Sequence, residues 1–463
     1  MKATVLADFG STFTKVTLVE TSTARLLGQA QAPSTSTTDV IRGYHQALSI
    51  ASARAGNPEL GLRRAASSAG GGLRVAAIGL VEDLTSAAAT QAALNAGGRV
   101  ELVLSGRLDD AKVSLLQQVA PEVILLAGGT DGGNEDGVLH NAQALSVAQP
   151  RAVVIVACNA VVARKVAEVV SASGVPAEAV ANVMPRVGTL DVEPARRAIT
   201  RAFLSHVIQG KGLSATREFH DLVAMPTPEA VLAATQLIAA GSETHPGAGD
   251  VVVVDVGGAT TDVHSAVTAP NYETALDGPL MPTLPVLRTV QGDLGMRSSA
   301  GGVAAADEAW LIEQWGAATF GQTLEAAIDR RRGDPGYIPN ATGMTIDRLL
   351  ATSCVTVAMR RHCGELLTTL RRDAPPRITA SGPDLREVPL VIGTGGVLVT
   401  NAGGEQAVSD AVARRQPRSL VPQQPRVALD RHYVMAAAGV LSTIDPEAAM
   451  SLLAHEVLEP AKS

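Results

Sequence analysis

Two short segments of this sequence place an acidic residue at the end of an apolar run, followed by glycine and hydroxyl residues. They are Asp8-Phe9-Gly10-Ser11-Thr12-Phe13-Thr14-Lys15 and Asp255-Val256-Gly257-Gly258-Ala259-Thr260-Thr261-Asp262. Glycine lets the backbone turn tightly, so that its N–H groups and the neighbouring hydroxyl groups point toward phosphate oxygens. Taken alone, the first segment fits an ordinary hairpin turn equally well, but a second copy favours paired phosphate-binding loops.

The acidic residue of each segment is suited to a metal ion. Asp8 and Asp255 both follow strand-like apolar runs, and a carboxylate there suits Mg²⁺, which keeps several of its water ligands. A carboxylate near a terminal phosphate can also orient or deprotonate an attacking water molecule. We therefore predict that Asp8 and Asp255 bind the metal ion and act in catalysis. The predicted phosphate contacts are Gly10, Ser11, Thr12, Lys15, Gly257, Gly258, Thr260 and Thr261.

Two further glycine-rich turns follow apolar runs. Gly393-Thr394-Gly395-Gly396 follows a β-like run, and its glycines would let the backbone lie flat against an adenine or a ribose. We predict nucleoside contacts at Gly393, Gly395 and Gly396, although a plain strand-to-helix turn also fits. The turn Ala127–Asn134 could present Asp131 or Asp136 to the cleft, which makes Asp131 a third catalytic candidate, and a solvated surface turn is an equal alternative there. No Walker A pattern or dinucleotide fingerprint is present, and the histidines show no metal-ligand pairing.

The surrounding sequence predicts the elements that hold these turns. The first residues read as a strand, a turn and two more strands, followed by a helix over 39–55. Strand and helix patterns then alternate from about 75 to 173, which indicates a mostly parallel sheet flanked by helices. The predicted strands are Val75–Leu80, Val100–Leu104, Glu122–Ala127 and Ala152–Ala157, and the predicted helices are Thr85–Ala96, Leu108–Val119 and Val161–Ser173.

A second series of elements follows a predicted domain boundary. A helix over Pro226–Ala240 ends in the Ser/Gly/Pro-rich stretch Gly241–Gly249, after which the opening pattern of strand, aspartate and glycines returns. We predict one lobe over 1–245 and another over 246–463, with a subdomain inserted at about 270–388. The repeated order of motifs suggests an ancient duplication.

Composition excludes several classes of function. The chain has 463 residues, enough for two domains, and its 2% aromatic content with a net charge of −7 argues against nucleic-acid binding. We expect no signal peptide and no membrane span, because no apolar run is long enough. The three cysteines, Cys158, Cys354 and Cys363, show no paired short spacing, and an odd number of free cysteines suits a reducing compartment. These features predict a cytoplasmic protein.

Two Asp-X-Gly loops and a late Gly-Gly turn resemble the actin, heat-shock chaperone and sugar-kinase superfamily. This resemblance implies an α/β fold with two ribonuclease-H-like lobes and a cleft for Mg²⁺ and ATP between them. Within it, the chain is most similar to the MutL/GlmL proteins associated with glutamate mutase. Besides the two loops, the similar stretches are Ala66–Arg74, Leu126–Asn134 and Gly292-Asp293-Leu294-Gly295-Met296-Arg297.

The MutL/GlmL resemblance implies a slow ATPase acting as a reactivating chaperone for a cobalamin-dependent carbon-skeleton mutase. Such a chaperone would use ATP to open the mutase and release damaged cobalamin, with a mutase-binding surface in the 270–389 region. A small-molecule kinase of the same fold and an actin-like scaffold protein remain alternatives. The sequence leaves open the identity of the mutase and whether the chain forms a homo-oligomer.

Overall fold

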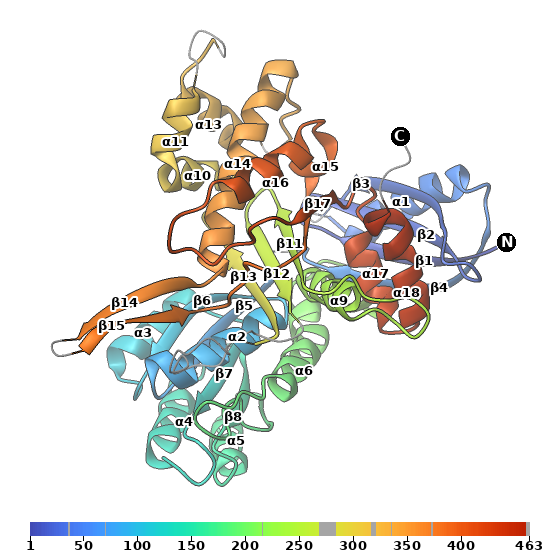
Figure 1. Ribbon diagram of the computed structural model, residues 1–463. Helices are drawn as coiled ribbons and strands as arrows, with labels where there is room; N and C mark the ends of the chain where they lie inside the picture. Colours follow the sequence, from blue (N-terminus) through green and yellow to red (C-terminus); the bar gives the residue numbers. More distant parts are fainter. Residues whose placement is uncertain are drawn as a thin grey trace. The chain divides into compact units, whose positions relative to one another are not determined.

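The computed structural model describes residues 1–35, 38–69, 71–214, 216–267, 284–315, 321–334, 336–371 and 374–459 (Figure 1). The chain forms two compact units. Unit 1 includes Met1–Val231 and Gly439–Ile444, and unit 2 includes most of Leu232–Ala438 together with the chain from Asp445 onward. The predicted boundary at 245/246 and the inserted subdomain at about 270–388 stay predictions. Within that range, 268–283, 316–320, 335 and 372–373 lie outside the described residues.

The first sheet of unit 1 has five strands in the order β10-β4-β1-β2-β3. β1, β2 and β3 form an antiparallel meander. β4 pairs parallel with β1, and β10 pairs parallel with β4, so both are reached by crossover connections. Its elements are β1 (Lys2–Phe9), β2 (Phe13–Glu20), β3 (Leu26–Pro33), α1 (Val40–Arg54), β4 (Glu59–Ser67) and β10 (Val223–Pro226). This strand order is that of a ribonuclease-H-like sheet.

A second, fully parallel sheet of five strands lies between β4 and β10 in the sequence, in the order β6-β5-β7-β8-β9. Its strands are β5 (Leu73–Gly79), β6 (Gly98–Ser105), β7 (Val123–Gly128), β8 (Val153–Cys158) and β9 (Ala177–Ala179). Its helices include α2 (Ala87–Asn95), α3 (Asp110–Val119), α4 (Asp136–Ala148), α5 (Ala163–Ser171) and α6 (Glu193–Ala202). Alternate residues of β7 enter two different cores, Leu125 in one and Ile124 in the other. Burial on both faces explains why β7 and β8 are continuously apolar.

Unit 2 repeats the strand order of the first sheet. Its five-stranded sheet runs β13-β12-β11-β16-β17, with the same sequence of antiparallel and parallel pairs. The strands are β11 (Val251–Val256), β12 (Thr261–Ala266), β13 (Val286–Gln291), β16 (Leu390–Thr394) and β17 (Arg426–Leu429). Val252 and Val254 pack in one core with Leu350 and Val355 of a long buried helix, α14 (Ala341–His362).

Unit 2 carries a different insertion from unit 1. Between β13 and β16 the chain forms α10 (Ala300–Ala306), α11 (Glu308–Gln314), α13 (Leu324–Gly333), α14 and the hairpin of β14 (Glu365–Arg371) and β15 (Ala374–Ser381). The remaining helices include α9 (Thr227–Ala240), α15 (Gly396–Thr400), α16 (Gly404–Ala413), α17 (Val434–Ser442) and α18 (Pro446–Leu453). Among the described helices, none combines the length and the apolar character that crossing a bilayer requires.

The predicted fold class is confirmed: the chain is an α/β protein with two ribonuclease-H-like lobes of the actin-like ATPase type. The parallel alternation predicted from 75 to 173 is present, and each predicted strand overlaps one of β5 to β8. The sequence did not indicate that this sheet is an insertion between β4 and β10.

Candidate functional site

The first predicted phosphate loop is a tight turn between β1 and β2, formed by Gly10–Phe13 (loop 1). The Gly10 N–H donates to the Phe13 carbonyl at 3.1 Å, and a Cβ added at Gly10 would lie 2.6 Å from that same oxygen. Ser34 holds the turn from outside, because its hydroxyl donates to the Gly10 carbonyl at 2.7 Å. Ser11 and Thr12 are exposed at the tip. Loop 1 therefore has a fixed base and an accessible tip.

Asp8 lies near the end of β1, directly across from Lys15 on β2. The Thr227 hydroxyl donates to Asp8 Oδ1 at 2.6 Å. Burial raises the pKa of the Asp8 carboxyl, while the Lys15 charge and the Thr227 hydrogen bond oppose this shift. A half-buried carboxylate whose pKa is raised is a group whose charge a bound cation would stabilise, so Asp8 fits the predicted Mg²⁺ ligand.

The second loop repeats the first in backbone geometry. Gly257–Thr260 (loop 2) joins β11 to β12, and the Gly257 N–H donates to the Thr260 carbonyl at 2.9 Å, as Gly10 does to Phe13. Asp255 corresponds to Asp8 in the strand register, and Gly258 is exposed. Thr261 was predicted to contact phosphate, but it is buried, and its hydroxyl donates to the Leu294 carbonyl at 2.9 Å.

The Gly393–Gly396 turn lies beside Asp255 because β16 pairs in parallel with β11. Gly395 has φ +97°, and a Cβ there would lie 2.8 Å from Asp255 Oδ1 and would also overlap the Val256 carbonyl. Gly396 is exposed, and a Cβ there would meet open space. Glycine at 395 is thus required by the backbone, whereas glycine at 396 leaves a flat, accessible surface.

The Gly292–Arg297 segment, which follows β13, lies along loop 2. Its Met296 and Arg297 N–H groups donate to the Gly257 and Gly258 carbonyls at 3.0 and 2.7 Å. In unit 2, the structure therefore brings together three stretches that the sequence analysis considered separately: loop 2, the Gly393–Gly396 turn and this segment.

Asp131 occupies a different sheet from Asp8. It follows β7 of the inserted parallel sheet, where Asp131 Oδ1 accepts hydrogen bonds of 2.9 Å from the Ala160 N–H and from the Asn182 amide. Asn182 also donates to the Gly129 carbonyl at 2.9 Å. These contacts give Asp131 a role in joining the loops at the carboxyl end of the inserted sheet, and its catalytic role remains a prediction.

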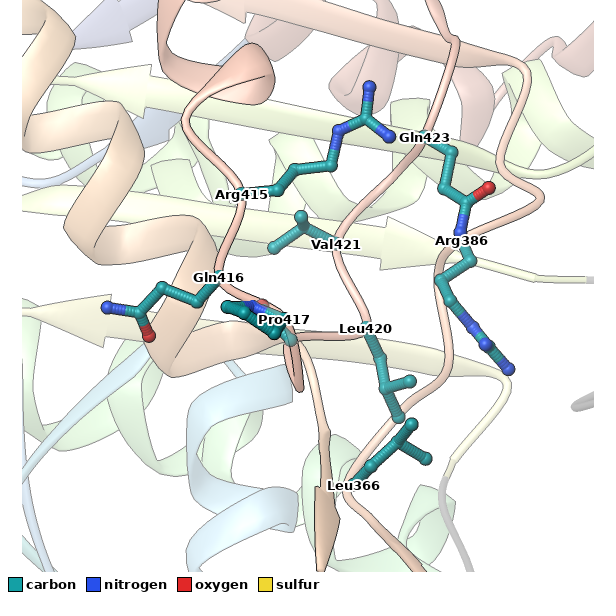
Figure 2. A pocket seen from close by; sticks show the side chains of 9 residues that line it. Leu366, Arg386, Arg415, Gln416, Pro417, Leu420, Val421 and Gln423 are labelled. Carbon is teal, nitrogen blue, oxygen red and sulfur yellow. The ribbon is translucent and has the colours of Figure 1, made fainter.

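Unit 2 also contains a cavity of about 320 Å³ that involves none of the predicted site residues. It lies where β14 begins, and Figure 2 shows Leu366, Leu420 and Val421 among its lining side chains. Arg386 at its edge is held by Asp384 in an ion pair of 2.7 Å. None of the residues that line this cavity belongs to loop 2 or to the Gly393–Gly396 turn.

Sequence comparison identifies the family. Residues 4–457 match the family model described as MutL protein. Protein MutL of Clostridium tetanomorphum is 35% identical over 460 residues, which cover 98% of each chain. The chain belongs to the MutL family. The resemblance expected from the loops and the glycine-rich strings is thus confirmed over nearly the whole sequence.

Solved structures similar to this MutL-family chain are distant. A nucleotide-free acetone carboxylase has a TM-score of 0.42 at 14% identity, covering 95% of this chain and 70% of that one. A nucleotide-free diol dehydratase-reactivating factor has a TM-score of 0.37 at 12% identity, covering 96% and 99%. A ROK-family glucokinase from Streptomyces griseus, in complex with glucose and AMPPNP, has a TM-score of 0.34 at 11% identity, covering 96% and 98%. The fold assignment rests on the strand order of the two sheets.

Two residues beside the candidate site residues carry no motif in the sequence. Thr227, the first residue of α9 directly after β10, contacts Asp8 through a hydrogen bond that spans 219 positions of sequence. Asp430, after β17, is its counterpart in unit 2: it accepts from the Thr394 hydroxyl at 3.0 Å and from the Val434 N–H at 2.7 Å. Burial raises the pKa of Tyr433 to about 12, with Asp430 and Asp255 adding to the shift. Aligning the two repeats strand by strand would have indicated these positions.

The donor set fits magnesium better than a transition metal. Within the described parts of the MutL-family chain, no three His, Cys, Asp or Glu side chains gather as a metal-binding group. Asp8 in unit 1 and Asp255 in unit 2 each offer a single carboxylate, a hard oxygen donor of the kind that hydrated Mg²⁺ accepts through water. The three cysteines are buried, and burial raises the pKa of the Cys158 and Cys354 thiols to about 12, which leaves them poor thiolate ligands.

Proposed function

We propose that this MutL-family chain binds ATP with Mg²⁺ and hydrolyses it slowly, as an accessory chaperone that reactivates a cobalamin-dependent carbon-skeleton mutase such as glutamate mutase. The observation that carries the ATPase part is a repetition: the same strand, aspartate and glycine turn occupy the same place in both ribonuclease-H-like sheets. Membership of the MutL family supports the mutase partner. We place this activity in the cytoplasm.

The residue roles follow from the two loops. Exposed N–H groups and hydroxyls at Ser11, Thr12 and Gly258 bind phosphate oxygens, with Lys15 adding positive charge near Asp8. Asp8 and Asp255, each in its own lobe, would contact hydrated Mg²⁺ through water, and the ion would supply neutralising charge for the phosphates. Asp255 also orients the attacking water.

The nucleoside is assigned to the Gly393–Gly396 turn. Gly396 presents bare backbone, and a base or a sugar packs closely only where no side chain intervenes. Because β16 is the neighbour of β11, a nucleoside at this turn is near the Asp255 end of the same sheet. Loop 2 and the turn together form the proposed nucleotide-binding edge of the unit 2 sheet.

Affinity capture from the native cell extract tests the proposed function. The tagged wild-type chain is incubated with extract plus Mg²⁺ and ATP, with ADP or without nucleotide, beside an Asp255→Ala control. We expect a cobalamin enzyme to be recovered in one nucleotide state, and to lose this nucleotide dependence with Asp255→Ala. Recovery of no cobalamin enzyme in any state would contradict the chaperone assignment.

A further inference from the structure

The Gly292–Arg297 segment is fixed to loop 2 at several points, so the two stretches form one unit of backbone. Besides the bonds from Met296 and Arg297 to the loop, Thr261 reaches back to the Leu294 carbonyl at 2.9 Å. A Cβ added at Gly295 would lie 2.7 Å from the Gly258 carbonyl, so only glycine fits there. Any displacement of loop 2 therefore moves the backbone of Arg297 as well.

The side chain of Arg297 extends from this backbone to the inserted helices. Its Nη2 lies 3.6 Å from Asp347 Oδ2 on α14 and donates to the Tyr337 carbonyl at 3.2 Å, while Nη1 donates to the Met296 carbonyl at 2.8 Å. A Cβ at Gly258 would lie 3.6 Å from Arg297 Cγ, which places the arginine stem over the exposed loop residue. Arg297 thus touches loop 2 and α14 at once.

Asp347 is shared between two guanidinium groups. Its other oxygen accepts from Arg331 Nε at 2.6 Å, and Arg331 on α13 is fully buried. Arg331 also donates to the carbonyls of Ala327 at 2.7 Å and Gly343 at 3.0 Å, which joins the end of α13 to the start of α14. One carboxylate balances only one of the two positive charges. Arg297 is partly exposed, whereas Arg331 is fully buried, so the positive charge left unbalanced is at Arg297, where it can attract an anion bound on loop 2.

We propose that Arg297 is a positioning residue that couples loop 2 to the α13–α14 pair through Asp347. A phosphate group on loop 2 attracts the Arg297 guanidinium and weakens its hold on Asp347, so that nucleotide binding is transmitted to the inserted helices. This inference rests on the proposed function for its ligand, but the contact chain from Gly258 to Arg331 exists without one.

Hydrogen exchange, measured with and without Mg-ATP, tests the coupling in wild type, Arg297→Ala, Arg297→Lys and the control Arg332→Ala. Arg332 is exposed on α13 and pairs with Asp329. We expect ATP to change exchange over 324–350 in wild type and in Arg332→Ala, and this change to be absent in Arg297→Ala. Arg297→Ala should also raise KM for ATP on the order of tenfold.

The lysine variant separates charge from geometry. Lysine keeps the positive charge but loses the planar fork that reaches Asp347 and Tyr337 together. We therefore expect Arg297→Lys to restore KM toward the wild-type value without restoring the change over 324–350. An unaltered exchange response in Arg297→Ala would overturn the proposal.

Hydrogen exchange measured without nucleotide distinguishes failure of the coupling from failure of the proposed function. If wild type binds no ATP, the proposed function fails, yet Arg297→Ala should still speed exchange both in loop 2 and at the start of α14. Equal exchange of Arg297→Ala and wild type at those amides, with equal melting temperatures, would overturn the coupling whatever the nucleotide result.

Discussion

At the scale of single residues, Asp8 carries a cost in stability that a bound cation would offset. Burial raises its pKa above the ordinary value of 3.8, so the folded protein holds the proton more tightly than the unfolded chain does. Stability therefore falls as the pH rises from that value through the folded pKa. Ionising Asp8 in the folded protein therefore costs stability, as expected for a carboxylate kept for its function.

Asp8→Asn removes this charge and keeps an oxygen that accepts from Thr227. We expect the melting temperature at neutral pH to rise above wild type and ATP hydrolysis to be lost. The difference in melting temperature should shrink as the pH falls below the unfolded value of 3.8, because Asp8 then becomes protonated in both states of the wild type. Thermal melts between about pH 3 and pH 8 measure this. A variant that melts lower at neutral pH and still hydrolyses ATP would refute the role given to Asp8.

Two adjacent glycines provide a matched pair of alanine variants. Gly395 has a positive φ and no room for a Cβ, whereas Gly396 faces open space. Gly395→Ala should destabilise the protein by on the order of 2 kcal/mol or more, because both backbone strain and overlap oppose it. Gly396→Ala should leave the melting temperature unchanged and weaken ATP binding, as calorimetry would measure. Unchanged ATP affinity in Gly396→Ala would remove the nucleoside from this turn.

At the scale of elements, the sequence predicted what depends on local pattern. The run Val251–Val254 followed by Asp255 and glycines indicates a buried strand and a tight turn without any knowledge of neighbours, and β11 and loop 2 are where it predicts them. The alternation from 75 to 173 likewise follows from local periodicity and gives the parallel sheet.

Long-range pairing was not readable in the same way. β4 and β10 are neighbours in the first sheet although the whole parallel sheet separates them in sequence. The contact of Thr227 with Asp8 depends on that pairing. In the same way, the contact of the Gly292–Arg297 segment with loop 2 depends on the pairing of β13 with β12. Such contacts depend on tertiary packing, for which a single sequence gives no local signal.

The hydrogen bonds that Asp131 accepts at the end of the inserted sheet predict that it stabilises the fold. Asp131→Ala removes the acceptor for the Ala160 N–H and the Asn182 amide, so we expect a loss of about 1 kcal/mol in the free energy of unfolding. The ATPase rate per folded molecule of this variant tests the predicted catalytic role separately from stability. The exposed Glu168, on α5, provides a control whose alanine variant should be near neutral. A large fall in kcat for Asp131→Ala alone would make Asp131 catalytic.

At the scale of the whole chain, two equivalent sheets carry different insertions. Unit 1 holds a parallel sheet between its fourth and fifth strands, and unit 2 holds helices and a hairpin between its third and fourth. The repeated part contains both loops, whereas the insertions differ in every element. This division suggests that the repeated sheets serve the nucleotide and that the insertions serve what is particular to this family, including its protein partner.

The central claim is that the two loops bind and hydrolyse ATP, and phosphate release by the purified chain tests it most directly. Wild type, Asp255→Asn and Arg332→Ala are compared at saturating Mg-ATP, with ATP binding followed in parallel by calorimetry. We predict slow phosphate release by wild type and Arg332→Ala, and ATP binding without turnover by Asp255→Asn. Absence of ATP binding by the folded wild-type chain, or full turnover by Asp255→Asn, would contradict the account.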